Sequence, residues 1–74
     1  MRRYLLQTIC DYYLEVRYRW VNGIKKYRAC YQEKYKFTWH PIAGSRWEVK
    51  RADAQKFLDR YARSVGIVKP EKEY

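Results

Sequence analysis

The chain has 74 residues, with seventeen Lys or Arg against eight Asp or Glu, so its formal net charge at pH 7 is +9. This length excludes two separate cores and makes an enclosed active site difficult to build, and a hydrophobic content of 47% argues against disorder. We therefore expect a single small domain over residues 1–74 whose partner is anionic: DNA, RNA or an acidic protein surface. No apolar run approaches the length of a membrane span or a signal peptide, which predicts a cytoplasmic protein that does not contact a membrane.

A long β-hairpin is predicted in the first half of the chain. Residues 3–20 alternate between apolar and polar side chains, residues 25–39 alternate again, and Asn22-Gly23 lies between them. Asn-Gly is a strong hairpin signal because both central residues of a type I′ turn need a positive φ. A two-residue loop fixes the register, so we expect Leu14 to face Tyr31 and Val16 to face Ala29. Extended to the base, the same register pairs Leu6 with Trp39, Thr8 with Phe37, Cys10 with Tyr35 and Asp11 with Lys34.

One face of this hairpin is unusually basic. Arg17 is predicted to face Arg28, Arg19 to face Lys26, and no acidic residue occurs from residue 16 to residue 32. Like charges directly opposite each other destabilise a pair of strands, so an anionic partner is the better explanation of the pattern. Tyr13 lies on the same face, where its ring could stack on an unpaired base. The predicted contact residues are Arg17, Arg19, Lys25, Lys26, Arg28, Tyr13 and Lys34.

The length of the alternating stretches requires a break. Strands of seventeen residues would be about 56 Å long, whereas a compact domain of this size has a radius of gyration of only about 11 Å. We expect the break at residues 11–13 and 32–34, where Glu33 interrupts the apolar face. The tyrosines are also compatible with helical spacing, since Tyr27, Tyr31 and Tyr35 are four apart, so an all-α three-helix fold is the alternative.

The second half of the chain predicts a short third strand and a helix. Residues 46–50 alternate, with Trp47 and Val49 inward, and residues 51–65 carry an apolar stripe that includes Phe57. Trp47 and Phe57 are expected at the centre of the core, and residues 68–74 form a charged, flexible tail. The predicted fold is therefore α+β: a three-stranded antiparallel sheet packed by one C-terminal helix. The helix is long enough to cover only the base of the hairpin, and the uncovered apolar face of its tip is a candidate homodimer contact.

No catalytic, metal-binding or cofactor-binding pattern is present. Cys10 and Cys30 are expected to be reduced and to face apart, so that His40 cannot complete a zinc site with them. Glu48-Val49-Lys50 resembles one half of a nuclease motif, but the upstream Asp that the motif needs is not in the right context. We therefore predict a protein without enzymatic activity, metal or cofactor.

Two functions fit these observations. The first is a small nucleic-acid-binding protein, with duplex DNA favoured because a two-stranded ribbon fits the major groove. The second is a non-enzymatic inhibitor or adaptor that docks on an acidic protein surface, such as a phage or mobile-element protein that targets a host nuclease complex.

Overall fold

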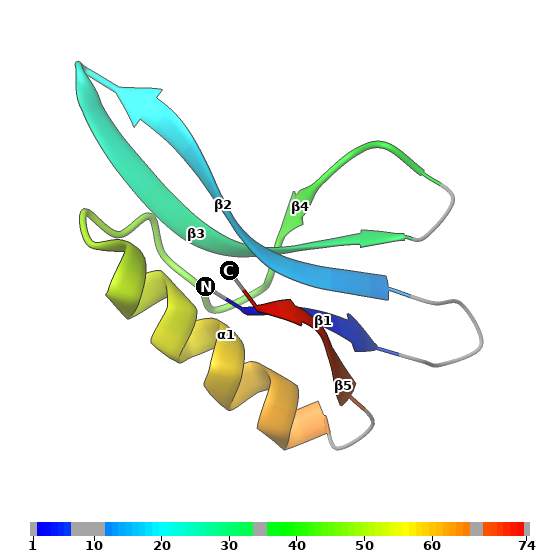
Figure 1. Ribbon diagram of the computed structural model, residues 1–74. Coiled ribbons are helices and arrows are strands. Elements are labelled where there is room, and N and C mark those ends of the chain that lie inside the picture. The colour runs from blue at the N-terminus through cyan, green and yellow to red at the C-terminus, as the bar shows by residue number, and fades with distance from the viewer. Residues whose placement is uncertain (1, 7–11, 34–35, 66–67, 74) are drawn as a thin grey trace.

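A computed structural model of the chain describes residues 2–6, 12–33, 36–65 and 68–73. Within these ranges the chain forms one antiparallel sheet in the strand order β4-β3-β2-β1-β5, with a single helix packed on one face (Figure 1). The predicted α+β class is confirmed, whereas the predicted number of three strands is too small and the all-α alternative is wrong. The elements are β1 (Arg2–Leu6), β2 (Tyr12–Val21), β3 (Ile24–Glu33), β4 (His40–Pro41), α1 (Arg51–Val65) and β5 (Val68–Glu73).

The β2–β3 hairpin has the predicted turn and register. Asn22 and Gly23 both have positive φ, at 50° and 76°, as a two-residue type I′ turn requires. The ladder runs without a shift from the pair Val21 and Ile24 to the pair Tyr12 and Glu33. Both strands end at the predicted break, so the prediction of a break at this level is confirmed.

Below that break the predicted continuation of the hairpin is wrong. The chain folds back, so that Leu6 pairs with Tyr12 and Tyr4 pairs with Leu14 in a second antiparallel ladder, and Leu6 does not face Trp39. Residues 36–39 are not a strand, and the side chain of Phe37 is 95% exposed. This arrangement stays compact where one continuous hairpin could not. The other predicted base pairs involve residues 8, 10, 11, 34 and 35, which lie outside the described residues.

The predicted third strand at residues 46–50 is also wrong. A different short strand, β4, pairs with β3, and residue Glu48 makes only an isolated antiparallel bridge with Tyr27. Between them the chain turns at Gly44, whose φ of 86° is in the region that glycine adopts without strain. Trp47 consequently does not enter the core, and Val49 is 63% exposed.

The segment predicted to be a flexible tail is a strand of the sheet. β5 pairs antiparallel with β1 and forms the edge of the sheet beyond it, with a register shift between Arg3 and Tyr4. Pro70 in β5 lacks an N–H donor, and an edge strand tolerates proline because only one of its sides is hydrogen-bonded. Proline therefore excluded a helix here but did not exclude a strand.

The core lies between α1 and the base of the hairpin. Leu58 is fully buried at 0% exposure, and it packs with Leu14, at 1%. The phenol of Tyr4 in β1 donates a 2.6 Å hydrogen bond to Asp59 in α1, and this bond connects the sheet to the helix. Phe57 is partly buried at the margin of the core, so the prediction that Trp47 and Phe57 are central is wrong. The buried apolar residues of the core cluster are Leu14, Val16, Ala29, Ile42, Ala54, Leu58 and Ala62.

The helix begins and ends as its sequence predicts. Asp53 lies in its first turn and Arg63 in its last, where each charge interacts favourably with the helix dipole. The helix lies along one face of the sheet (Figure 1), and its buried residues Ala54, Leu58 and Ala62 belong to the core cluster. Among the described residues, no helix is both long enough and apolar enough to cross a bilayer.

Candidate nucleic-acid interface

The hairpin extends beyond the part that α1 covers, and we call residues 17–28 the arm (Figure 1). Burial changes abruptly where the arm begins: Val16 is 4% exposed, whereas Tyr18 is 57% and Trp20 is 66% exposed. All three residues lie on the same face of β2, because side chains alternate along a strand. In the arm, therefore, this face of β2 is exposed and is not part of the core.

One side of the arm, the arginine face, consists of Arg17, Arg19, Lys26 and Arg28. The predicted pairs are confirmed, since Arg17 lies directly opposite Arg28 and Arg19 directly opposite Lys26. These two pairs are neighbours on one face of the ladder, since the pair between them, Tyr18 with Tyr27, faces the opposite side. Contacts of the three arginines with tryptophan rings offset part of the resulting repulsion.

Two tryptophans pack against the arginine face: Trp39 from the loop between β3 and β4, and Trp47 from the loop between β4 and α1. The guanidinium carbon of Arg17 lies 4.8 Å from the centroid of the Trp39 ring, and that of Arg19 lies 4.1 Å from the Trp47 ring. Arg28 is also near Trp47, at 5.9 Å. A guanidinium stacked on a ring keeps the N–H groups in its own plane directed outward, available to phosphate or carboxylate oxygens. Sequence reasoning assigned Trp47 to the core and missed this role.

Arg17 and Arg28 also have polar partners within the fold. Arg17 forms a 3.0 Å ion pair with Glu15, whose side chain is almost fully buried. Arg28 donates a 2.7 Å hydrogen bond from Nε to the hydroxyl of Ser45, which itself donates to the carbonyl of Ile42. The pairing with Glu15 was visible in the sequence, because residues two apart on a strand share a face. Arg17 and Arg28 are therefore partly structural, whereas no acidic partner for Arg19 or Lys26 occurs among the described residues.

The opposite side of the arm, the aromatic face, consists of Tyr18, Trp20, Lys25 and Tyr27. The ammonium nitrogen of Lys25 lies 4.0 Å from the centroid of the Tyr18 ring, 5.7 Å from Tyr27 and 6.0 Å from Trp20. At the foot of the arm, Arg51 from the start of α1 lies 5.3 Å from the Tyr27 ring. Lys25, predicted as a contact residue, is thus on the other side of the arm from the arginines.

Two further predicted contact residues do not belong to the arm. Tyr13 is half-buried and pairs with Gln32 near the base of the hairpin. It lies on the same face of β2 as Arg17, but below the arm. Tyr13 also has an interaction partner within the chain. Lys34 lies outside the described residues.

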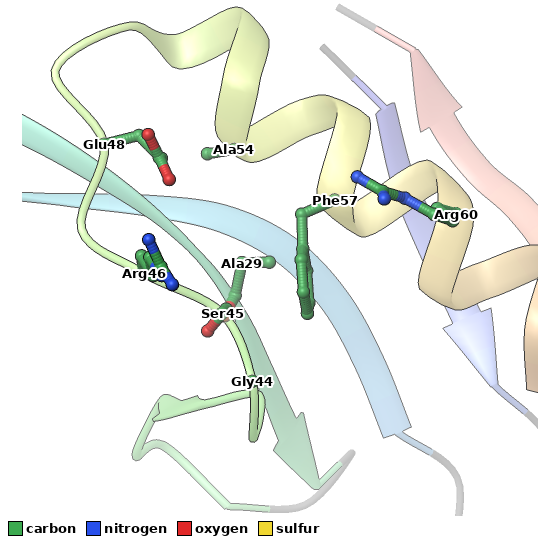
Figure 2. A pocket seen from close by; sticks show the side chains of 8 residues that line it. All are labelled: Ala29, Gly44, Ser45, Arg46, Glu48, Ala54, Phe57 and Arg60. Atoms are coloured by element: carbon green, nitrogen blue, oxygen red, sulfur yellow. The ribbon is translucent and has the colours of Figure 1, made fainter.

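A separate cavity of about 350 Å³ lies between α1 and the loop that leads into it (Figure 2). Figure 2 shows Phe57 projecting from the helix toward this loop, with Arg46 and Glu48 on the loop side and Arg60 on the helix side. The lining thus combines cationic and anionic side chains. Ser45 also lines the cavity, but its hydroxyl is engaged by Arg28 and by the Ile42 carbonyl.

The Cys30 thiol is buried within the fold, outside the arm. Burial raises the pKa of the Cys30 thiol, an effect that nearby Arg28 and Arg17 partly oppose. The thiol is buried and donates a long hydrogen bond, 3.5 Å, to the carbonyl of Arg28. Within the described ranges, no three His, Cys, Asp or Glu side chains are grouped closely enough to hold a metal ion.

Comparison of the chain with protein-family models, with curated proteins and with solved structures found no match.

Proposed function

We propose that this protein binds nucleic acid, with the arginine face of the arm in contact with the phosphate backbone. The observation that carries the proposal is the ladder of four facing cations, Arg17 with Arg28 and Arg19 with Lys26, on an arm that projects from the core. The net charge of +9 adds a long-range attraction to any polyanion. Duplex DNA is the first substrate to test, because its major groove, about 12 Å wide, admits a two-stranded ribbon.

The stacking of the arginines favours this function over a merely solvated charged surface. Arg17 and Arg19 each lie over an indole ring, so their side chains are partly ordered before a ligand arrives. An ordered guanidinium loses less conformational freedom on binding, and its planar set of donors matches two oxygens of a phosphate. Solubility alone does not require like charges to face each other across two strands, an arrangement that destabilises the sheet.

The test compares two pairs of substitutions that remove the same amount of charge. Arg19→Gln with Lys26→Gln removes two cations from the arginine face, and it spares the Arg17 and Arg28 contacts with Glu15 and Ser45. Lys56→Gln with Arg63→Gln removes two cations from the exposed side of α1. At fixed salt we expect the first pair to weaken binding to a labelled duplex of arbitrary sequence by at least about tenfold, and the second pair by far less. Equal losses in the two variants would show that net charge, and not the arm, governs the binding.

The arm also suits an acidic protein surface, and the exposed Trp20 and Tyr18 favour this second candidate because aromatic residues anchor protein interfaces. On this proposal the protein is an inhibitor or adaptor and the same arginines meet carboxylates. It predicts little affinity of the wild-type protein for free nucleic acid at physiological salt.

A further inference from the structure

The aromatic face of the arm has no role in the contact proposed above, and its exposure is not explained by folding. Trp20 is 66% exposed and Tyr18 is 57% exposed, on strands whose neighbouring residues Val16 and Ala29 are almost fully buried. Large exposed aromatic side chains that lie side by side mark contact surfaces on small soluble proteins. The surface is also charged, because Lys25 lies among the rings.

We propose that the aromatic face stacks on unpaired bases, so that the ligand of the arm is nucleic acid with a single-stranded segment. This inference rests on the proposed function and narrows its substrate class. Base–aromatic stacking tolerates any sequence, since every base has a π-face, and a cation beside the rings can neutralise the adjoining phosphate. Lys25, 4.0 Å from the Tyr18 ring, is in the position to do so.

The spacing of the rings favours an unpaired strand over a duplex. Tyr18 and Trp20 are two residues apart on one strand, which places their Cα atoms about 6.6 Å apart. In a duplex, neighbouring nucleotides of one strand are only about 3.4 Å apart along the axis, and the base faces are covered by their neighbours. Adjacent bases can therefore reach both rings only where the strand is unpaired and stretched.

The charges on the two faces of the arm fit a single-stranded nucleic acid better than they fit a protein partner. Cations occur on both sides, Arg19 and Lys26 on one and Lys25 on the other, so a partner that wraps the arm meets positive charge throughout. A flexible single strand can pass from one face to the other and offer phosphates and base faces alternately. A folded acidic protein that docks on one side of the arm leaves the cations of the other side without a partner.

The test measures the affinity for a labelled single strand and for the duplex that it forms with its complement. We expect Trp20→Ala and Tyr18→Ala each to weaken single-strand binding by about 5- to 150-fold, the range that losing one base stack on alanine substitution implies. Duplex binding should change less than about twofold. Trp20→Phe should restore most of the single-strand affinity, because phenylalanine keeps a flat ring.

Phe37→Ala is the matched control, since Phe37 is 95% exposed but lies outside the arm, and it should leave both affinities unchanged. Circular dichroism of each variant checks that the fold is retained. If both nucleic acids bind with a salt dependence but the aromatic substitutions weaken them equally or not at all, the stacking inference fails while the proposed function stands. If neither binds at any salt, both fail. If wild type sediments as a dimer that Trp20→Ala dissociates, the aromatic face belongs to a second copy of the chain and the inference fails.

Discussion

The base and the arm of the β2–β3 hairpin are built from the same two strands in one uninterrupted register, yet they differ in what covers them. At the base, Leu14 and Ala29 are each 1% exposed beneath α1, whereas in the arm Trp20 is 66% exposed. A helix of fifteen residues is about 22 Å long and cannot cover both parts of the hairpin. The comparison shows that apolar alternation determines which face a side chain takes, while the reach of the neighbouring helix determines whether that face is buried.

Loss of a core side chain at the base of the hairpin should destabilise the fold more than any other substitution considered below. Leu58→Ala removes a fully buried side chain and should lower the free energy of unfolding by about 2–5 kcal/mol, enough to unfold a domain of this size. Trp20→Ala, in the arm, should change it by no more than about 0.5 kcal/mol despite removing a larger side chain. Denaturant unfolding of both variants measures the contrast. Comparable losses would mean that the arm is packed in solution.

A smaller effect separates Arg17 and Arg28, which have polar partners, from Arg19 and Lys26, for which the described part of the chain holds no acidic partner. Arg17→Gln removes the ion pair to buried Glu15 and should lower the free energy of unfolding by about 1–2 kcal/mol. Lys26→Gln, on the same face, should leave it unchanged or raise it slightly, because a like-charged neighbour opposite Arg19 is removed. Thermal unfolding of the two single variants at equal salt tests this. Identical midpoints would contradict a structural role for Arg17.

The smallest effect concerns the tryptophan against the arginine face. Trp47→Leu retains an apolar side chain but removes the ring over which Arg19 lies, and it should cost about 0.5–1 kcal/mol of stability. High salt should not abolish this difference if the contact is partly desolvated. A double-mutant cycle with Arg19→Gln isolates the pairwise contribution, and a coupling energy of zero would show that the two side chains do not interact.

The parts of the fold that depend on local chemistry were predictable. Asn22-Gly23 specified the turn, and with it the pairs Arg17 with Arg28 and Arg19 with Lys26, since a two-residue loop leaves no freedom of register. The helix from Arg51 to Val65 was equally clear from its apolar stripe.

The remaining parts depend on contacts that no local pattern specifies. Residues 7–11 contain no Gly or Pro, so the alternation passes from β1 into β2 without a turn signal, and two strands were interpreted as one. The charged residues of β5 and Pro70, which keeps this segment out of the helix, predict a tail, although an edge strand accepts both proline and charged residues. The alternation of residues 46–50 predicts a strand with Trp47 directed into the core, whereas this segment is not a strand and the Trp47 ring contacts Arg19.

The salt dependence of wild-type binding to duplex DNA shows whether the arm contacts phosphates. If Arg17, Arg19, Lys26 and Arg28 each neutralise about one phosphate, log affinity should fall against log salt with a slope of about −3.6. A measured slope between about −3 and −4.5 is the predicted result. A slope near zero, or no binding at low salt, would show that the arm does not contact phosphates.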